Sequence, residues 1–199
     1  MMATTENQIL TAANTVFHRK GFTGARMQEI ADEAGINKAM LHYYFKNKQE
    51  LFKAVFMQAF VKFAPQLNAI FSAHEGIFDK IRQFTANYID FVTENPHLPA
   101  FIIQEMNNNP EFAKDFFQHQ DKPNMTPFIN QLEKEVAAGT IKEINPKQLL
   151  INILALSAFP FVAPVMVKGL LKISEEEFAA LMQERKTLIA EQIINSIKK

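Results

Sequence analysis

The chain has 199 residues, of which 48% are hydrophobic, and this is enough for one domain or two small ones with a real core. Its 21 Lys and Arg balance its 21 Asp and Glu, which excludes a strongly basic protein, and the absence of cysteine excludes disulfides and thiolate metal sites. The first residues, MMATTENQ, have no basic segment followed by an apolar run, so we expect no signal peptide and a cytoplasmic location.

The first predicted helix extends from about Thr5 to Gly21. Thr5 and Gln8 resemble a capping box, and glycine is a common helix terminator. Between them, an apolar stripe at helical spacing consists of Ile9, Leu10, Ala13, Val16 and Phe17. We expect this helix to support the two short helices that follow it.

Two short helices joined by a glycine turn are predicted next. The apolar face of the first helix consists of Met27, Ile30, Ala31 and Ala34. Gly35 ends it, and Asn37 is a good N-cap for the second helix, at about 38–45. The second helix has an apolar edge of Leu41, Tyr44 and Phe45 opposite a polar edge of Lys38, His42 and Tyr43.

Such a pair of helices suits the major groove of DNA, because the groove admits one helix and these polar side chains can donate to phosphates or base edges. An ordinary helical hairpin has the same pattern. Residues 1–62 hold eight Lys and Arg and five Asp and Glu, a net charge of +3, and residues 63–199 hold thirteen and sixteen, a net charge of −3. A modestly basic head on an acidic body is compatible with phosphate binding.

The segment from Ala31 to Leu51 reads A-x-x-x-G-I-x-K-x-x-L-x-Y-Y-F-x-x-K-x-x-L and follows F-x-x-K-G-F at 17–22. It resembles the N-terminal domain of TetR/AcrR-type transcriptional regulators. The resemblance implies that the second short helix is the recognition helix, that aromatic residues near its end hold phosphates, and that the lysine opening the next helix contacts the DNA backbone. Together with Arg26 and Asn37, the DNA-binding residues expected at matching positions are Lys38, Ala39, Met40, His42, Tyr43 and Lys48.

This sequence departs from the family's pattern at three positions. Ala25 stands where the family often has threonine, Met40 where it has a small or hydroxylated residue, and His42 where it has tyrosine. These departures concern the bases that are read and one phosphate contact.

The rest of the chain is predicted to be helical. A long helix from Lys48 to about Ser72, kinked at Pro65, should join the head to the body. Further helices are expected at 76–95, around 99–107, at 111–119 and at 125–138.

Thirteen of the nineteen phenylalanines lie beyond residue 62. Most phenylalanines at helical spacing belong to a core, but helical bundles often leave an apolar cavity that binds a ligand. The candidate lining residues are Phe63, Leu67, Tyr88, Phe91, Ile102, Met106 and Phe128. The candidate polar anchors for a ligand are Asn87, Gln104 and Glu105.

Leu149 to Val167 is a run of nineteen residues without a charge. The run is long enough for a membrane-spanning helix. Because Asn152, Ser157 and two prolines interrupt it, we expect instead a buried helix kinked near Pro160. A last helix should open at Ser174. Two such helices from each of two chains would form a four-helix interface, with candidate contacts at Leu154, Phe159, Phe161, Met166, Leu181, Leu188, Ile189 and Ile193.

The sequence contains no phosphate loop, metalloprotease motif or nucleophile elbow, and its five histidines lack metal-ligand spacing, so we expect neither an enzyme nor a cofactor. We predict an all-α protein with a three-helix DNA-binding head at 1–47, extending to about 62, and a ligand-binding and dimerisation body at 48–199. The expected partners are a double-stranded DNA operator, a second copy of the chain and an apolar or amphipathic small-molecule effector, with no membrane.

Two other functions are compatible with the same sequence. One is a small-molecule-binding or enzymatic helical bundle with a non-functional head. The other is an interaction protein that acts through its apolar C-terminal helix.

Overall fold

The structure is a computed structural model that describes residues 4–118 and 122–199. Within these residues the chain forms eleven α-helices. In chain order they are α1 (Thr5–Gly24), α2 (Met27–Glu33), α3 (Lys38–Tyr44), α4 (Lys48–Ser72), α5 (Ile77–Glu94), α6 (Leu98–Asn108), α7 (Pro110–Gln118), α8 (Thr126–Ala137), α9 (Pro146–Val162), α10 (Pro164–Leu171) and α11 (Glu175–Ile197).

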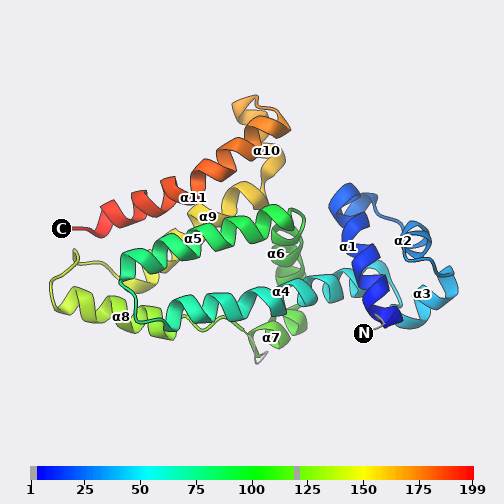
Figure 1. Cartoon of the computed structure of the whole chain (residues 1–199), viewed down its shortest axis with the longest axis horizontal. Coiled ribbons are helices and arrows are strands. Elements are labelled where there is room, and N and C mark those ends of the chain that lie inside the picture. Colours follow the sequence, from blue (N-terminus) through cyan, green and yellow to red (C-terminus); the bar gives the residue numbers. More distant parts are fainter. Residues whose placement is uncertain (1–3, 119–121) are drawn as a thin grey trace.

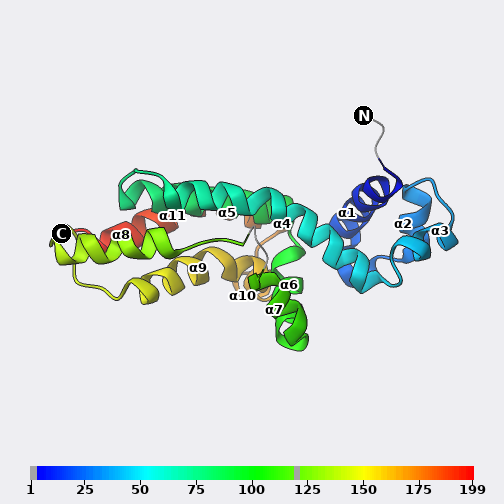
Figure 2. The same cartoon turned by 90° about the horizontal axis from the view of Figure 1, so that it is seen from below.

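The molecule is elongated, with α1, α2 and α3 at one end (Figure 1). The 25-residue helix α4 leaves this head and continues through the length of the body, where α5, α8, α9 and α11 lie alongside one another (Figures 1 and 2). The C-terminus lies at the far end from the head. Because α4 belongs to both parts, its tilt sets where the head lies relative to the body.

Local capping explains where α4 begins. Asn47 is its N-cap, and the Asn47 side chain accepts a hydrogen bond from the Glu50 amide at 2.8 Å. Pro65 lies inside the helix. The observed bounds agree with the range expected from the sequence.

Helix α1 differs in detail from the expectation. Its N-cap is Thr4, whose hydroxyl accepts from the Asn7 amide, so the expected capping box at Thr5 and Gln8 is wrong by one residue. Gly21 breaks the helix with φ 68° and ψ 174°, and one further turn reaches Gly24. Residue 119, expected at the end of a helix, lies outside the described residues.

The apolar segment near the C-terminus forms two helices rather than one kinked helix. α9 and α10 meet at Ala163 with a bend of 79°. Pro164 explains the break, since a proline lacks the amide that would continue α9 but is well placed at the first position of a new helix. Among the described helices, none alone is long and apolar enough to cross a membrane. Only the bent pair of α9 and α10 together has the length and composition of a membrane span.

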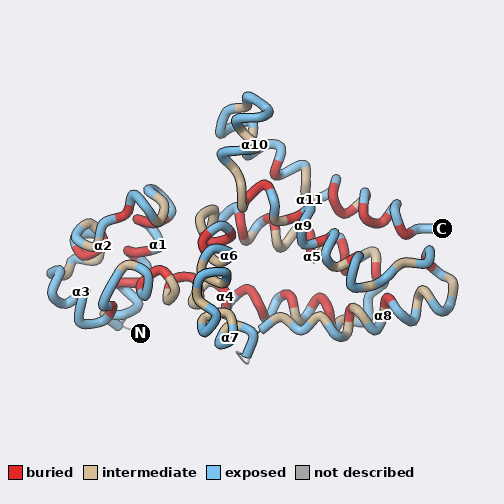
Figure 3. Tube along the Cα trace, turned by 180° about the vertical axis from the view of Figure 1, so that it is seen from behind, coloured by how far each residue is buried: buried red, intermediate tan, exposed pale blue. Residues whose placement is uncertain are grey.

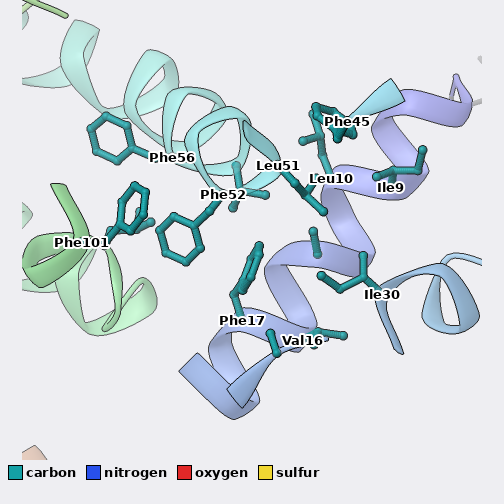
Figure 4. Packing of buried hydrophobic residues seen from close by; sticks show 14 of the residues in the cluster. Ile9, Leu10, Val16, Phe17, Ile30, Phe45, Leu51, Phe52, Phe56 and Phe101 are labelled. Atoms are coloured by element: carbon teal, nitrogen blue, oxygen red, sulfur yellow. The ribbon is translucent and has the colours of Figure 1, made fainter. Parts of the chain in front are cut away.

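The head has a core that a body helix completes. Figure 4 shows Ile9, Val16 and Phe17 of α1 packed with Ile30 of α2 and Phe52 of α4. Phe101 of α6 closes this cluster, with its ring 4.1 Å from that of Phe52. A second core lies in the body, where α5 and α11 pack against each other and against α9. The head therefore cannot move without moving its contact with α6.

Candidate nucleic-acid interface

The turn between α2 and α3 depends on a left-handed glycine. Gly35 has φ 67°, and the Ile36 amide donates to the Ala31 carbonyl at 3.0 Å, which satisfies a carbonyl at the end of α2. The Asn37 side chain then accepts from the Met40 amide at 2.8 Å and caps α3. Both signals were expected from the sequence, and together they fix the direction in which α3 leaves α2.

One side of α3 is anchored and the other is free. Leu41 and Phe45 are buried against the head core. The candidate DNA-binding residues lie on the exposed side, most of which is coloured as exposed in Figure 3: Asn37, Lys38, Ala39, Met40, His42 and Tyr43. Tyr43 is the most accessible aromatic residue of this surface, with 84% of its area exposed.

Tyr44 does not belong to the apolar edge that the sequence suggested. It is 41% exposed, and its ring stands edge-on to that of Tyr43 with centroids 5.5 Å apart. The chain leaves the helix at Phe45, whose side chain fills the core position instead. The pair of tyrosines therefore forms one aromatic surface at the end of α3.

His42 presents one particular ring nitrogen to solvent. Its Nδ1 lies 3.1 Å from the Lys46 carbonyl, and since a carbonyl oxygen can only accept, Nδ1 carries the proton and donates. In the neutral ring the outer nitrogen, Nε2, is then a hydrogen-bond acceptor.

Lys48 is held within the head. Its ammonium donates to the Ala25 carbonyl at 3.0 Å and to the Thr23 carbonyl at 3.4 Å, and it lies 4.7 Å from the centre of the Phe22 ring. An ammonium has three N–H donors, so two are engaged in fastening α4 to the connection between α1 and α2.

The positive charges of the head fall into two groups. Arg19 and Lys20 pair with Glu29, at 3.1 Å and 2.7 Å, and these partners lower the pKa of the Glu29 carboxyl, Lys20 contributing most. By contrast, within residues 4–118 and 122–199 no carboxylate pairs with Arg26 or Lys38, which remain available to an external anion. The same ranges contain no group of His, Asp and Glu side chains placed to hold a metal ion.

The candidate ligand residues of the body divide between several environments. An apolar cavity of about 200 Å³ is lined by six of them: Phe63, Leu67, Tyr88, Phe91, Ile102 and Met106. Phe56, Phe60, Phe84 and Phe116 also line the cavity and were not expected there, although Phe56, Phe60 and Phe63 recur at helical spacing on α4.

The remaining four candidates do not line this cavity. Phe128 is buried in the core beside Phe71, and Gln104 is exposed. Glu105 pairs with Lys53 and accepts from Asn109, while Asn87 donates to the Gln83 carbonyl and lines a separate polar cleft of about 420 Å³. Asn87, Gln104 and Glu105 are therefore not anchors for a ligand in the apolar cavity.

The candidate dimer contacts also divide. Leu154, Phe159, Met166, Leu181 and Leu188 are exposed on α9, α10 and α11. Phe161 of α9 and Ile189 and Ile193 of α11 are buried inside the subunit in clusters with residues of α5, so they belong to the core instead of a surface. Further apolar residues are exposed on α9 and α10, although none was expected as a dimer contact: Ile151, Leu156, Val165, Leu170 and Leu171.

Comparison with known proteins places this head in a family. Residues 9–55 match the model for bacterial regulatory proteins of the tetR family. An HTH-type transcriptional regulator of Haemophilus influenzae, itself uncharacterized, is 28% identical over 69% of this chain and 71% of its own length. The HTH-type transcriptional repressor NicS of Pseudomonas putida is 41% identical, but over only 30% of this chain and 28% of its own.

The fold is shared over nearly the whole length. The transcriptional regulator FadR from Bacillus subtilis, solved in complex with stearoyl-CoA, aligns with 92% of this chain and 96% of its own at a TM-score of 0.62 and 17% identity. The helix-turn-helix head, the all-helical body and these matches agree. The head at residues 9–55 is therefore similar to the DNA-binding domain of tetR-family bacterial regulatory proteins, and the chain as a whole has the fold of solved TetR-family regulators.

Proposed function

We propose that this protein is a ligand-responsive transcriptional repressor that binds a pseudo-palindromic DNA operator as a homodimer in the cytoplasm. The head comprises residues 1–47 and extends to about 62, and residues 48–199 form the ligand-binding and dimerisation body. The observation that carries this proposal is the division of α3 into an anchored face and an exposed face.

The exposed face of α3 has the chemistry of a DNA reader. Lys38 supplies a cation that has no carboxylate partner among the described residues, Tyr43 a phenol hydroxyl, and Met40 an apolar group, and all three side chains of α3 are exposed. Lys38 and Met40 lie in the first turn, where recognition helices of this type contact base edges. His42 presents Nε2 as an acceptor, which suits the amino group of adenine or cytosine in the major groove.

An exposed apolar face supports the homodimer. It contains Phe159 of α9, Met166 of α10 and Leu181 and Leu188 of α11, whereas Leu154 of α9 lines the apolar cavity. Large apolar side chains left exposed on helices that pack together, as α9 does with α10 and α11, are typical of an interaction site. Covering it with the same face of a second copy gives a two-fold dimer whose recognition helices would lie about 34–36 Å apart, one turn of DNA.

Helix α6 supplies a physical connection between the cavity and the head. Ile102 and Met106 line the cavity. Phe101 packs against Phe22 of the head at 5.3 Å, and His97, just before α6, donates from Nε2 to the His18 carbonyl at 3.2 Å. A ligand that favours one position of α6 would therefore favour one position of the head, provided that its affinities for the two arrangements differ.

Repression is proposed as the outcome because NicS, a relative of this head, is a transcriptional repressor by name. A protein bound to an operator near a promoter blocks transcription without any further contact. A reporter gene behind the selected operator tests the direction: expression should fall when the protein is produced, and a rise would indicate an activator.

The operator itself tests DNA binding. The purified full-length protein should enrich a two-fold symmetric sequence from a random DNA pool. Lys38→Ala should change which bases are preferred. If Lys38 also contacts a phosphate, it should lower the slope of log K against log salt by up to about 0.9 for each subunit, or about 1.8 for the dimer. Tyr43→Phe should instead weaken binding to all sequences alike, because it removes a phosphate donor without changing charge.

Other outcomes would point to other functions. If no sequence is enriched but small molecules raise the melting temperature, the protein is a ligand-binding bundle without a working head. If it is a monomer in light scattering until another protein is added, the apolar C-terminal face serves a different partner.

A further inference from the structure

The apolar cavity of the body has an unusual lining for its size. Seven of the sixteen side chains around it are aromatic, and none of the sixteen carries a charge. They come from α4, α5, α6, α7 and α9 and from the segment that leads into α8. A site of this composition favours a ligand that is itself uncharged, because burying a charge without a partner is costly.

The aromatic side chains are arranged as flat walls. Phe63 and Phe91 stack with ring centres 4.1 Å apart and an interplanar angle of 5°. Phe84 and Tyr88 stack at 5.8 Å and 21°. Flat aromatic surfaces accept another ring by offset stacking or edge-on contact, and such pairs add about 0.5–1.5 kcal/mol beyond area burial.

Tyr88 provides the single hydroxyl among the lining side chains. Burial raises the pKa of Tyr88 to about 12, so the hydroxyl keeps its proton at neutral pH. In the part of the chain that the structure describes, this hydroxyl makes no hydrogen bond to the protein. It is therefore available to one polar group of a ligand.

The volume suits a ligand of about one ring. An engineered protein cavity of about 150 Å³ holds benzene, whereas sites for drug-sized molecules measure about 300–1,000 Å³. The cavity here measures about 200 Å³. The stearoyl-CoA found with FadR carries a long chain and several negative charges. Neither the volume nor the uncharged lining of this cavity suits such a ligand.

We propose that the effector of this protein is an uncharged molecule with a single aromatic ring and one hydrogen-bonding substituent, of which phenol is the simplest case. The ring lies among the phenylalanines and the substituent bonds to the Tyr88 hydroxyl. This inference rests on the proposed function for its regulatory meaning, since Ile102 and Met106 of the cavity wall belong to the helix that contacts the head.

Calorimetric titration of the full-length protein without DNA tests the ligand class. Phenol should bind, cyclohexanol should bind about 3- to 10-fold more weakly because it lacks a ring face, and benzoate at neutral pH about 100-fold more weakly because its charge has no partner. Benzoate binding as tightly as phenol, or cyclohexanol binding equally well, would overturn the proposal, as would the absence of any phenol binding.

A pair of ligands isolates the role of Tyr88. Tyr88→Phe should raise the dissociation constant of phenol about 5- to 10-fold and change that of toluene by less than about twofold, since only phenol loses a hydrogen bond. An equal loss for both ligands would contradict the contact. Met106→Phe, which fills part of the cavity, should weaken both ligands together, and melting temperatures confirm that each variant folds.

Operator binding separates this inference from the function on which it rests. If phenol binds as expected but no DNA sequence is enriched, the cavity assignment stands and the regulator proposal fails. If an operator is found and phenol neither binds nor changes its affinity, the regulator proposal stands and the effector class is wrong.

Discussion

At the scale of single residues, Lys48 has a structural role in the head that the sequence did not indicate. Its position in the family motif implied a contact with the DNA backbone. In the folded chain its ammonium donates to the carbonyls of Thr23 and Ala25, at the point where α1 passes into α2. If substitution of Lys48 abolishes DNA binding, the cause could therefore be the loss of a phosphate contact or a less stable head.

A stability measurement resolves this mixture. Lys48→Met should lower the free energy of unfolding by about 1–2 kcal/mol, because two carbonyls lose a charged donor. Lys38→Met, at an exposed lysine of α3 without a carboxylate partner in the described chain, should change it by less than about 0.5 kcal/mol. Chemical denaturation of both variants gives the comparison, and equal effects would show that the Lys48 contacts contribute nothing.

Glu29 makes the head sensitive to acid. Lys20 and Arg19 hold the pKa of its carboxyl below the ordinary range. A lowered folded-state pKa means that the stabilisation is complete at neutral pH and is lost as pH falls through that value, in the range below about pH 4. We expect Glu29→Gln to melt at a lower temperature than the natural protein at pH 7, and the two melting temperatures to converge as the pH falls through the lowered pKa of Glu29. A constant difference across this range would contradict the ion pairs.

At the scale of elements, the angle between α2 and α3 depends on a single backbone conformation. Gly35 lies at φ 67°, and a Cβ added there would meet no atom within 4 Å. Any cost of a side chain at this position is therefore a cost of the backbone conformation alone.

Two substitutions at Gly35 measure that cost. Gly35→Ala should destabilise the protein by about 1–2 kcal/mol, because the left-handed region is unfavourable for residues with a Cβ. Gly35→Asn should lose less, since asparagine tolerates this region better. Thermal unfolding of both variants provides the test, and an alanine variant as stable as the natural protein would show that the turn adopts another conformation.

The break between α9 and α10 determines which apolar residues of α10 are exposed. Because Pro164 ends α9 and the next helix departs at 79°, α10 projects from the body and exposes Val165, Leu170 and Leu171 (Figure 1). An unbroken helix would have placed these residues along the axis of α9. The bend therefore extends the apolar face that we propose for the dimer.

At the scale of the whole molecule, the proposed dimer would cover the apolar face on α9, α10 and α11 and bring two heads to one operator. A charge at the centre of such a face separates subunits, because it would be buried without a partner. The same charge on an unrelated apolar residue should have no such effect.

Leu188→Glu and Phe159→Glu, at residues that are 51% and 50% exposed, should convert a dimer into monomers and weaken operator binding at least about tenfold. Val61→Glu, at a residue of α4 that is 38% exposed, is the matched control and should remain dimeric. Light scattering gives the mass of each variant. A Leu188→Glu protein that stays dimeric would place the interface elsewhere.

The sequence by itself determined the elements that local signals define. The Asn37 cap, the glycine at position 35 and the motif from Ala31 to Leu51 led to the helix-turn-helix head and to the start of α4. These signals act within a few residues of one another, so they can be read without knowing the rest of the fold.

Only the tertiary structure decided which apolar residues face one another. Periodicity gives the apolar side of a helix but not the neighbour that covers it, so Ile189 and Ile193 were expected at a dimer surface and lie against α5 instead. The cavity likewise needs side chains from five helices, and Phe101 completes a head core from the body. Helix packing fixes these contacts because it sets the rotation and position of each helix relative to all the others.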